Sequence, residues 1–188
     1  GNNTEHTPAS LVSFYLDSIW QIKRFVEKIS AEIISKDQLY SVLSGIPFHF
    51  ASREAYAHPE IKPHIKKEKK TDTEIIPTAH YHPVNGIFVS LQEQHYLQGS
   101  IVHEYGHYLH KKWYPKSYQE SDVTMLELIA IYMQEECGFP RQYQENTPHH
   151  RAKQLLQTCR QNLSLKRYTP ASFWKTLLKF KNHKALGG

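Results

Sequence analysis

The sequence has few cysteines and no long apolar run, and each absence excludes a class of protein. Only Cys137 and Cys159 occur among 188 residues, and they do not form a C-x-x-C pair. A disulfide scaffold and an all-cysteine zinc site are therefore excluded, while a single bridge between the two stays open. No apolar stretch approaches the roughly 18 residues that cross a bilayer, so we expect no membrane span.

Length and composition indicate one folded domain. The 39% hydrophobic and 12% aromatic content lies outside the disordered regime, and a chain of this length can bury a real core. We therefore treat residues 1–188 as a single domain. Much of the net charge of +5 lies in the run 62–70, which we interpret as part of an exposed basic loop over 59–73. This run lacks interleaved aromatics, so we expect no nucleic-acid partner.

Threonine–proline pairs predict where helices begin. A threonine cap followed by proline at the first helical position occurs at Thr7, Thr147 and Thr169. Apolar residues at steps of three and four predict that the first helix continues to about Ile34. A shorter helix is predicted over about 37–45, where a glycine ends it.

The middle of the chain predicts a β-hairpin followed by two helices. Residues 74–91 carry the clear β signal of the sequence, with turn residues at 83–86. The first central helix is expected to begin with Ser100 as its cap and to end near Trp113. The second should span about 122–137. We expect an α+β fold that is mostly helical, with a small sheet before the first central helix.

The first central helix carries the sequence HEYGH at positions 103–107, an H-E-x-x-H motif. His103 and His107 lie one helical turn apart, so their imidazoles can converge on one cation, while Glu104 can reach a water bound to it. The apolar residues of this helix share the opposite face. We expect the helix to pack by that face and to present both imidazoles on the other. A row of surface histidines would give the same pattern, and this reading stays open.

The second central helix is apolar almost all round and should be buried, yet Glu127 lies in its middle. An unpaired carboxylate in such a place is costly or takes up a proton. A metal ion would solve this problem. A salt bridge or hydrogen bond to a neighbouring helix is the alternative.

H-E-x-x-H with nineteen residues between its second histidine and a glutamate on the next helix resembles the gluzincin metallopeptidases, with the spacing of thermolysin-like enzymes. The resemblance covers about residues 99–138. It implies that His103, His107 and Glu127 are ligands of one Zn²⁺ per chain and that Glu104 is the general base. It also implies a compact zincin-like catalytic domain.

Other residues stay open as the third ligand. His110 shares a face with His107, but it lies about 10 Å along the helix axis from His103, so we expect it beside the site or on the surface. The metzincin pattern fails because His110 and Trp113 stand where that family has glycine and histidine. The remaining alternatives are glutamates near or on the second helix: Glu120, Glu135 and Glu136.

The resemblance also implies a donor for the oxyanion and a strand that binds substrate. Four candidates for the donor stay open: His149, His150, Tyr143 and Tyr132. Strand addition of the substrate is expected at the hairpin, on residues 85–90. His80 and His82 share one strand face but have no third partner nearby, so we expect them on the hairpin surface and not at a second metal.

The sequence thus predicts a zinc-dependent endopeptidase whose substrate is a peptide or protein and whose general base is Glu104. The alternative is a zincin-shaped sensor or binding module, with a structural or absent metal and a basic loop that binds an anionic partner. A metal-dependent hydrolase of another substrate stays open. The chain begins at Gly1, so we expect a processed piece, and a secreted or exported location is favoured. Oligomeric state and cleavage specificity are not indicated.

Overall fold

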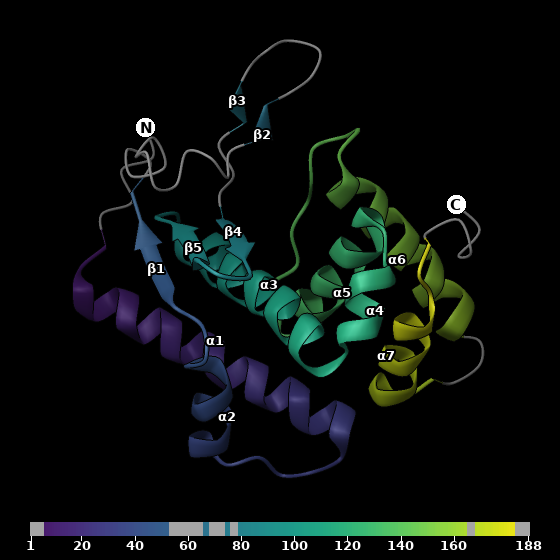
Figure 1. Ribbon diagram of the computed structural model, residues 1–188, viewed down its shortest axis with the longest axis horizontal. Coiled ribbons are helices and arrows are strands. Elements are labelled where there is room, and N and C mark those ends of the chain that lie inside the picture. Colours follow the sequence, from purple (N-terminus) through teal and green to yellow (C-terminus); the bar gives the residue numbers. More distant parts are fainter. Residues whose placement is uncertain (1–5, 53–65, 68–73, 76–78, 165–167, 183–188) are drawn as a thin grey trace.

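The computed structural model describes residues 6–52, 66–67, 74–75, 79–164 and 168–182. The fold is mostly helical with a small sheet, as expected (Figure 1). The helices are α1 (Pro8–Ser30), α2 (Lys36–Leu43), α3 (Gln94–Trp113), α4 (Pro115–Glu120), α5 (Val123–Glu136), α6 (Pro148–Ser164) and α7 (Pro170–Lys179). The strands are β1 (Phe48–Ala51), β2 (Lys66–Lys67), β3 (Glu74–Ile75), β4 (Ala79–His82) and β5 (Gly86–Ser90).

The predicted hairpin is confirmed, and it belongs to a three-stranded sheet with the order β1-β5-β4. β4 pairs antiparallel with β5, with His80 opposite Phe88, and β1 pairs parallel with β5, with Phe48 opposite Ile87. The expectation that residues 85–90 offer a free edge is therefore wrong, because β5 has a neighbour on each side. Among the described strands, β4 is the edge strand on the hairpin side.

Helix α3 is the centre of the molecule, with α1, α5 and the sheet packed around it (Figure 1). It is buried without interruption from Leu97 to His110. The side with the imidazoles is largely covered as well, so the alternative of a row of surface histidines is wrong, and both imidazoles line a cavity instead. His103 and His107 are 6% and 8% exposed.

The predicted start of α3 is also wrong. The helix begins at Gln94, and Ser100 is buried inside it instead of capping it. The misleading signal is Gly99, where a Cβ would lie 3.2 Å from Nε2 of Gln134. This glycine permits close packing between α3 and the end of α5, and does not mark a helix start.

The threonine caps are confirmed by their hydrogen bonds. Oγ1 of Thr7 accepts from the backbone of Ser10, and Oγ1 of Thr169 accepts from Ser172. Oγ1 of Thr147 accepts from the backbone N–H of His150. Helix α1 ends four residues before the predicted limit, because its C-cap adopts the left-handed conformation with φ 57° at Ala31.

Two other expectations have clear outcomes. Both cysteines are free, so the bridge between them does not form.

The structure describes only two residues of the basic run 62–70. Lys66 and Lys67 form a two-residue strand paired with β3, and not a loop. The rest of 59–73 lies outside the described residues. No described helix combines the length and the apolar character that a bilayer crossing requires.

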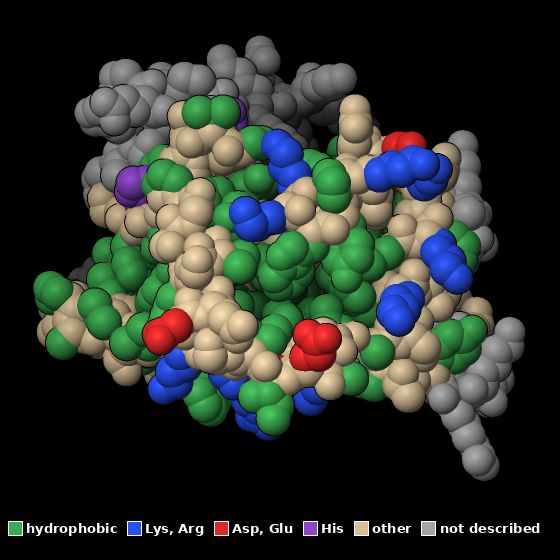
Figure 2. Space-filling view, turned by 60° about the horizontal axis from the view of Figure 1, so that its bottom comes forward, with side chains coloured by type: hydrophobic (Ala, Val, Ile, Leu, Met, Phe, Trp, Pro, Cys, Tyr) green, Lys and Arg blue, Asp and Glu red, His purple; other side chains and the backbone are tan. Residues whose placement is uncertain are grey.

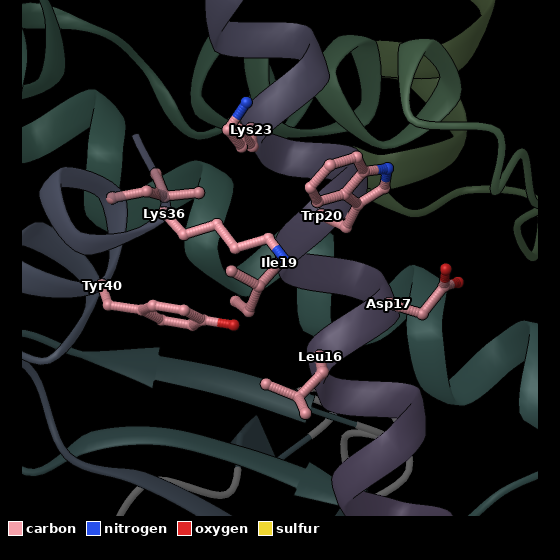
Figure 3. A pocket seen from close by; sticks show the side chains of 8 residues that line it. Leu16, Asp17, Ile19, Trp20, Lys23, Lys36 and Tyr40 are labelled. Carbon is pink, nitrogen blue, oxygen red and sulfur yellow. The ribbon is translucent and has the colours of Figure 1, made fainter. Parts of the chain in front are cut away.

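The outer surface of α1 carries exposed apolar side chains beside α2. Figure 2 shows hydrophobic side chains gathered in the middle of this face, with charged groups around them. A shallow cavity of about 270 Å³ lies between the two helices, and its lining includes Leu16, Trp20 and Tyr40. Lys23 and Lys36 approach the indole of Trp20 at 5.2 and 5.0 Å (Figure 3).

The hairpin turn requires glycine at position 86. Gly86 has φ +102°, and a Cβ there would lie 2.3 Å from the carbonyl oxygen of Pro47. Gly86→Ala should lower the free energy of unfolding by more than about 3 kcal/mol, because backbone strain and a backbone clash add together. Gly138→Ala is the matched control: φ is +91° with nothing near its Cβ, so strain alone should cost about 1–2 kcal/mol. Urea unfolding of both variants measures the difference, and equal losses would contradict the clash.

Candidate metal centre

The structure brings the predicted ligands together. Nε2 of His103 lies 2.8 Å from Oε2 of Glu127, and Nε2 of His107 lies 3.2 Å from Oε1. One ligand atom from each of the three residues falls within 4.8 Å of the others. Two imidazoles and one carboxylate are a common ligand set for catalytic zinc, which leaves a coordination position open.

Close packing of α3 on α5 makes this convergence possible. A Cβ on Gly106 would lie 3.3 Å from Cα of Ala130, so the two backbones nearly touch at this point. Gly106 directly precedes His107, and Ala130 lies one turn after Glu127. The small residues therefore bring the two ligand-bearing turns against each other.

Gln134 fixes the orientation of the His103 ring. Its side-chain amide donates to the carbonyl oxygen of Phe139 at 2.7 Å, which turns its Oε1 toward His103. Nδ1 of His103 lies 2.9 Å from that oxygen and must donate to it, because an amide oxygen only accepts. Tyr143 donates to the same oxygen at 3.1 Å. The proton of a neutral His103 is thus on Nδ1, and the lone pair of Nε2 faces the carboxylate of Glu127.

A lone pair facing a carboxylate is repulsive, so this arrangement needs a positive charge between or on the two groups. The ion-pair partners of Glu127 within the described part of the chain are all imidazoles, and none is a lysine or arginine. Burial by itself would raise the pKa of Glu127, but the surrounding imidazoles outweigh burial and hold this pKa well below 4.5. A protonated imidazole would supply this charge, and so would a divalent cation bound by the lone pairs and the carboxylate.

Glu104 lies in the same cavity with its carboxyl group buried. Burial raises the pKa of Glu104 above 4.5, and the imidazoles of His103 and His107 oppose this rise. A carboxyl group whose pKa is shifted toward neutrality is suited to accept a proton and to return it.

Of the four oxyanion candidates, the structure places His149 and Tyr143 at the site. Both line the cavity, and Nε2 of His149 lies 2.6 Å from Oε2 of Glu127. Tyr132 is excluded, because it is buried against Phe173 and Trp174. His150 is not part of the cavity wall.

The alternative third ligands lie elsewhere. Glu120 pairs with Lys181, while Glu135 and Glu136 pair with Arg160 at 3.2 and 3.0 Å. Each of these carboxylates therefore has its own cation. The structure brings none of them to the imidazoles of the H-E-x-x-H motif.

The hairpin histidines differ in position. His80 stacks on Phe88 at 4.9 Å and lines the cavity, while Nδ1 of His82 accepts from the turn backbone at Val84 and Asn85. His82 therefore supports the turn. Within the described residues the only three-ligand cluster is that of His103, His107 and Glu127, and it includes neither hairpin histidine.

His110 is fully buried and is not a ligand; its Nε2 lies 2.9 Å from Oγ of Ser117. Burial lowers its pKa from 6.5 to about 3. The native state then stays unprotonated while the unfolded chain takes up a proton, so stability is lost as the pH falls from 6.5 toward 3.

We expect His110→Gln to reduce this acid sensitivity. Wild-type protein should lose about 2 kcal/mol more than the variant between pH 7 and pH 5, because each pH unit in this window contributes about 1.4 kcal/mol. Urea unfolding of both proteins at the two pH values tests the prediction. A wild-type loss no larger than that of the variant would show that His110 titrates normally.

The cavity around the cluster has a volume of about 640 Å³ and is formed by α3, α4, α5, β4, the segment between α5 and α6, and the first residues of α6. Sequence reasoning assigned no role to several of its polar residues, among them Tyr118, Gln134 and Arg141. Gln134 did carry a signal, since it lies seven residues after Glu127 on the same helix face. Comparison with protein-family models, curated proteins and solved structures gives no match to this chain.

Proposed function

We propose that this protein is a zinc-dependent endopeptidase with a zincin-like catalytic domain. The observation that carries the proposal is the orientation of His103 by Gln134, which aims a lone pair at the partly buried carboxylate of Glu127. His107 completes a donor set of two nitrogens and a carboxylate, which fits Zn²⁺.

His103, His107 and Glu127 would hold the ion. When bound, it would supply Lewis acidity, which lowers the pKa of a water molecule and polarises a carbonyl group. Glu104 takes a proton from the water molecule while the oxygen of that water attacks the scissile carbonyl carbon. The C–N bond then breaks, and Glu104 returns the proton to the leaving amine, so the products are a carboxylic acid and an amine.

The cavity wall fits an extended peptide. Ala79, His80 and Tyr81 of the edge strand β4 line the cavity, so a substrate strand could pair with β4 beside the imidazoles. His149, which also lines the cavity, is the candidate donor to the developing oxyanion, because the hydroxyl proton of Tyr143 already goes to Oε1 of Gln134.

The alternative, a binding module that uses the basic run, has less support. A purely structural metal site has no need of a buried carboxyl group such as Glu104 beside the ligands.

The test is elemental analysis of the purified full chain together with digestion of unfolded casein. We expect one zinc per chain and cleavage that stops when a chelator removes the metal and resumes when zinc is restored. Protein that binds no zinc after reconstitution would refute the proposal, as would zinc-loaded protein that cleaves neither casein nor a mixed peptide library.

A further inference from the structure

Arg141 is a cation in the wall of the metal cavity, and no carboxylate of the described part of the chain lies within ion-pair distance of it, although Glu104 is near enough to favour its charged form. Its Nη2 donates to the carbonyl oxygen of Tyr96 at 2.8 Å and to Oγ of Ser100 at 3.1 Å, both of them neutral acceptors. The guanidinium also lies over the ring of Tyr96 at 5.1 Å. Burial lowers the pKa of Arg141, which remains charged at neutral pH.

Arg160, which also packs against α5, has carboxylate partners. Arg160 on α6 pairs with two carboxylates on α5, Glu135 and Glu136. Arg141 instead keeps its Nε and Nη1 groups without an acceptor among the described residues, in a cavity that a substrate would enter. A desolvated guanidinium with spare donors is the usual means of binding a carboxylate through two parallel hydrogen bonds.

The side chain is placed close to the reacting groups. Its partner Ser100 lies one helical turn before His103 on α3, about 4.5 Å along the helix axis, and also lines the cavity. A group bound to Arg141 would therefore lie within about one residue of the scissile bond.

The segment that carries Arg141 is held in place. Lys153 donates to the carbonyl oxygen of Arg141 itself, and His95 donates to that of Pro140 at 3.0 Å. The backbone on both sides of the guanidinium is thus tied to α3 and α6, and the cation is positioned before a ligand arrives.

We infer that Arg141 determines substrate specificity by binding a carboxylate next to the scissile bond. This inference rests on the proposed peptidase function. The carboxylate is either the C-terminus of the substrate or an aspartate or glutamate side chain. The first would make the protein act near peptide ends, and the second would make it select acidic sites.

The experiment compares kcat/KM for matched peptides with the zinc-loaded full chain. One pair has the same apolar sequence ending in a free carboxylate or an amide, and a second amidated pair has internal glutamate or glutamine. Wild-type protein should prefer the charged member of one pair by about 10- to 100-fold, as expected for a charged hydrogen-bond pair. A preference within the terminal pair would show that Arg141 binds the C-terminal carboxylate of the substrate. A preference within the internal pair would show that it binds an acidic side chain.

Arg141→Gln should reduce that preference to less than about 3-fold, and Arg141→Lys should retain part of it because it keeps the charge. Arg151→Gln, on the exposed side of α6, is the control for the loss of one positive charge. Each preference is the ratio of two kcat/KM values measured on the same protein sample. Partial unfolding or weaker zinc binding lowers both values equally and therefore cancels from the ratio. A structural role for Arg141 would lower cleavage of both members equally.

The inference is overturned if wild-type protein cleaves both members of each pair equally, or if Arg141→Gln keeps the preference. If no peptide is cleaved, the proposed function fails, and calorimetric binding of the same peptides to the wild-type protein still tests Arg141. At least tenfold tighter binding of a charged member, lost in Arg141→Gln, would support the inference, whereas equal or absent binding would overturn it.

Discussion

Glu104→Gln should lower kcat for peptide hydrolysis by about 10²–10⁴-fold, the usual contribution of a general base. The amide keeps the size and polarity of the side chain but cannot accept the proton of the attacking water. Because the proposed ligand set is His103, His107 and Glu127, the zinc content should stay at that of the wild type. KM should change little, since the substitution removes a group used in the transition state.

The measurement combines single-substrate kinetics with elemental analysis on the same preparation. Glu145→Gln is the matched control, because Glu145 is exposed in the segment before α6 and does not line the cavity. We expect the control to retain wild-type activity. A Glu104→Gln variant that keeps wild-type kcat would exclude Glu104 as the base. Loss of zinc together with activity would instead assign Glu104 to the ligand set.

The local features of the fold were predictable because they depend on neighbouring residues. Thr7, Thr147 and Thr169 mark true helix starts, since a capping hydroxyl and the following proline act within one turn. The hairpin turn was predictable for the same reason, because its residues 83–86 are neighbours in the sequence. By contrast, β1 was missed, because four residues that pair in parallel with a strand far along the chain leave no local pattern.

The candidate site also has residues that the sequence could predict and residues that it could not. His103, His107 and Glu127 were predictable, because H-E-x-x-H fixes two positions on one turn and a lone carboxylate stood out in an apolar helix. Arg141 was not predictable, since it lies in an irregular segment whose path is set by contacts with α3 and α6. The edge strand of the sheet was misassigned for a related reason, because the edge of a sheet depends on every strand in it.

The carboxylates of the cavity and the side chains around them meet one physical requirement, which is that a cation can still bind there. The structure brings the carboxylates of Glu127 and Glu104 into one cavity, and the ion-pair partners of Glu127 among the described residues are imidazoles, not lysine or arginine. Histidine can give a lone pair to a cation, whereas lysine and arginine would neutralise Glu127 and fill the site. The nearest arginine in the cavity wall, Arg141, contacts neutral acceptors instead of these carboxylates.

Glu127→Gln should abolish the stabilisation that zinc gives to the folded protein. A ligand at about 1,000 times its Kd adds about 4 kcal/mol to the free energy of unfolding. For a chain of this size that corresponds to a rise in Tm of roughly 8–16 °C. The variant should show a rise of less than about 2 °C, because a neutral amide oxygen replaces the charged ligand opposite His103 and His107.

Each protein serves as its own reference, since the quantity compared is the Tm with zinc minus the Tm after chelation. Any direct effect of the substitution on the metal-free protein therefore cancels. Glu136→Gln is the matched control: it lies on the same helix and pairs with Arg160 at 3.0 Å, away from the cluster, so it should keep the full rise. An equal rise in wild type and Glu127→Gln would mean that zinc binds elsewhere. The pairing of Glu127 with imidazoles would then be a buried salt-bridge network, and the hydrolytic proposal would lose its ligand set.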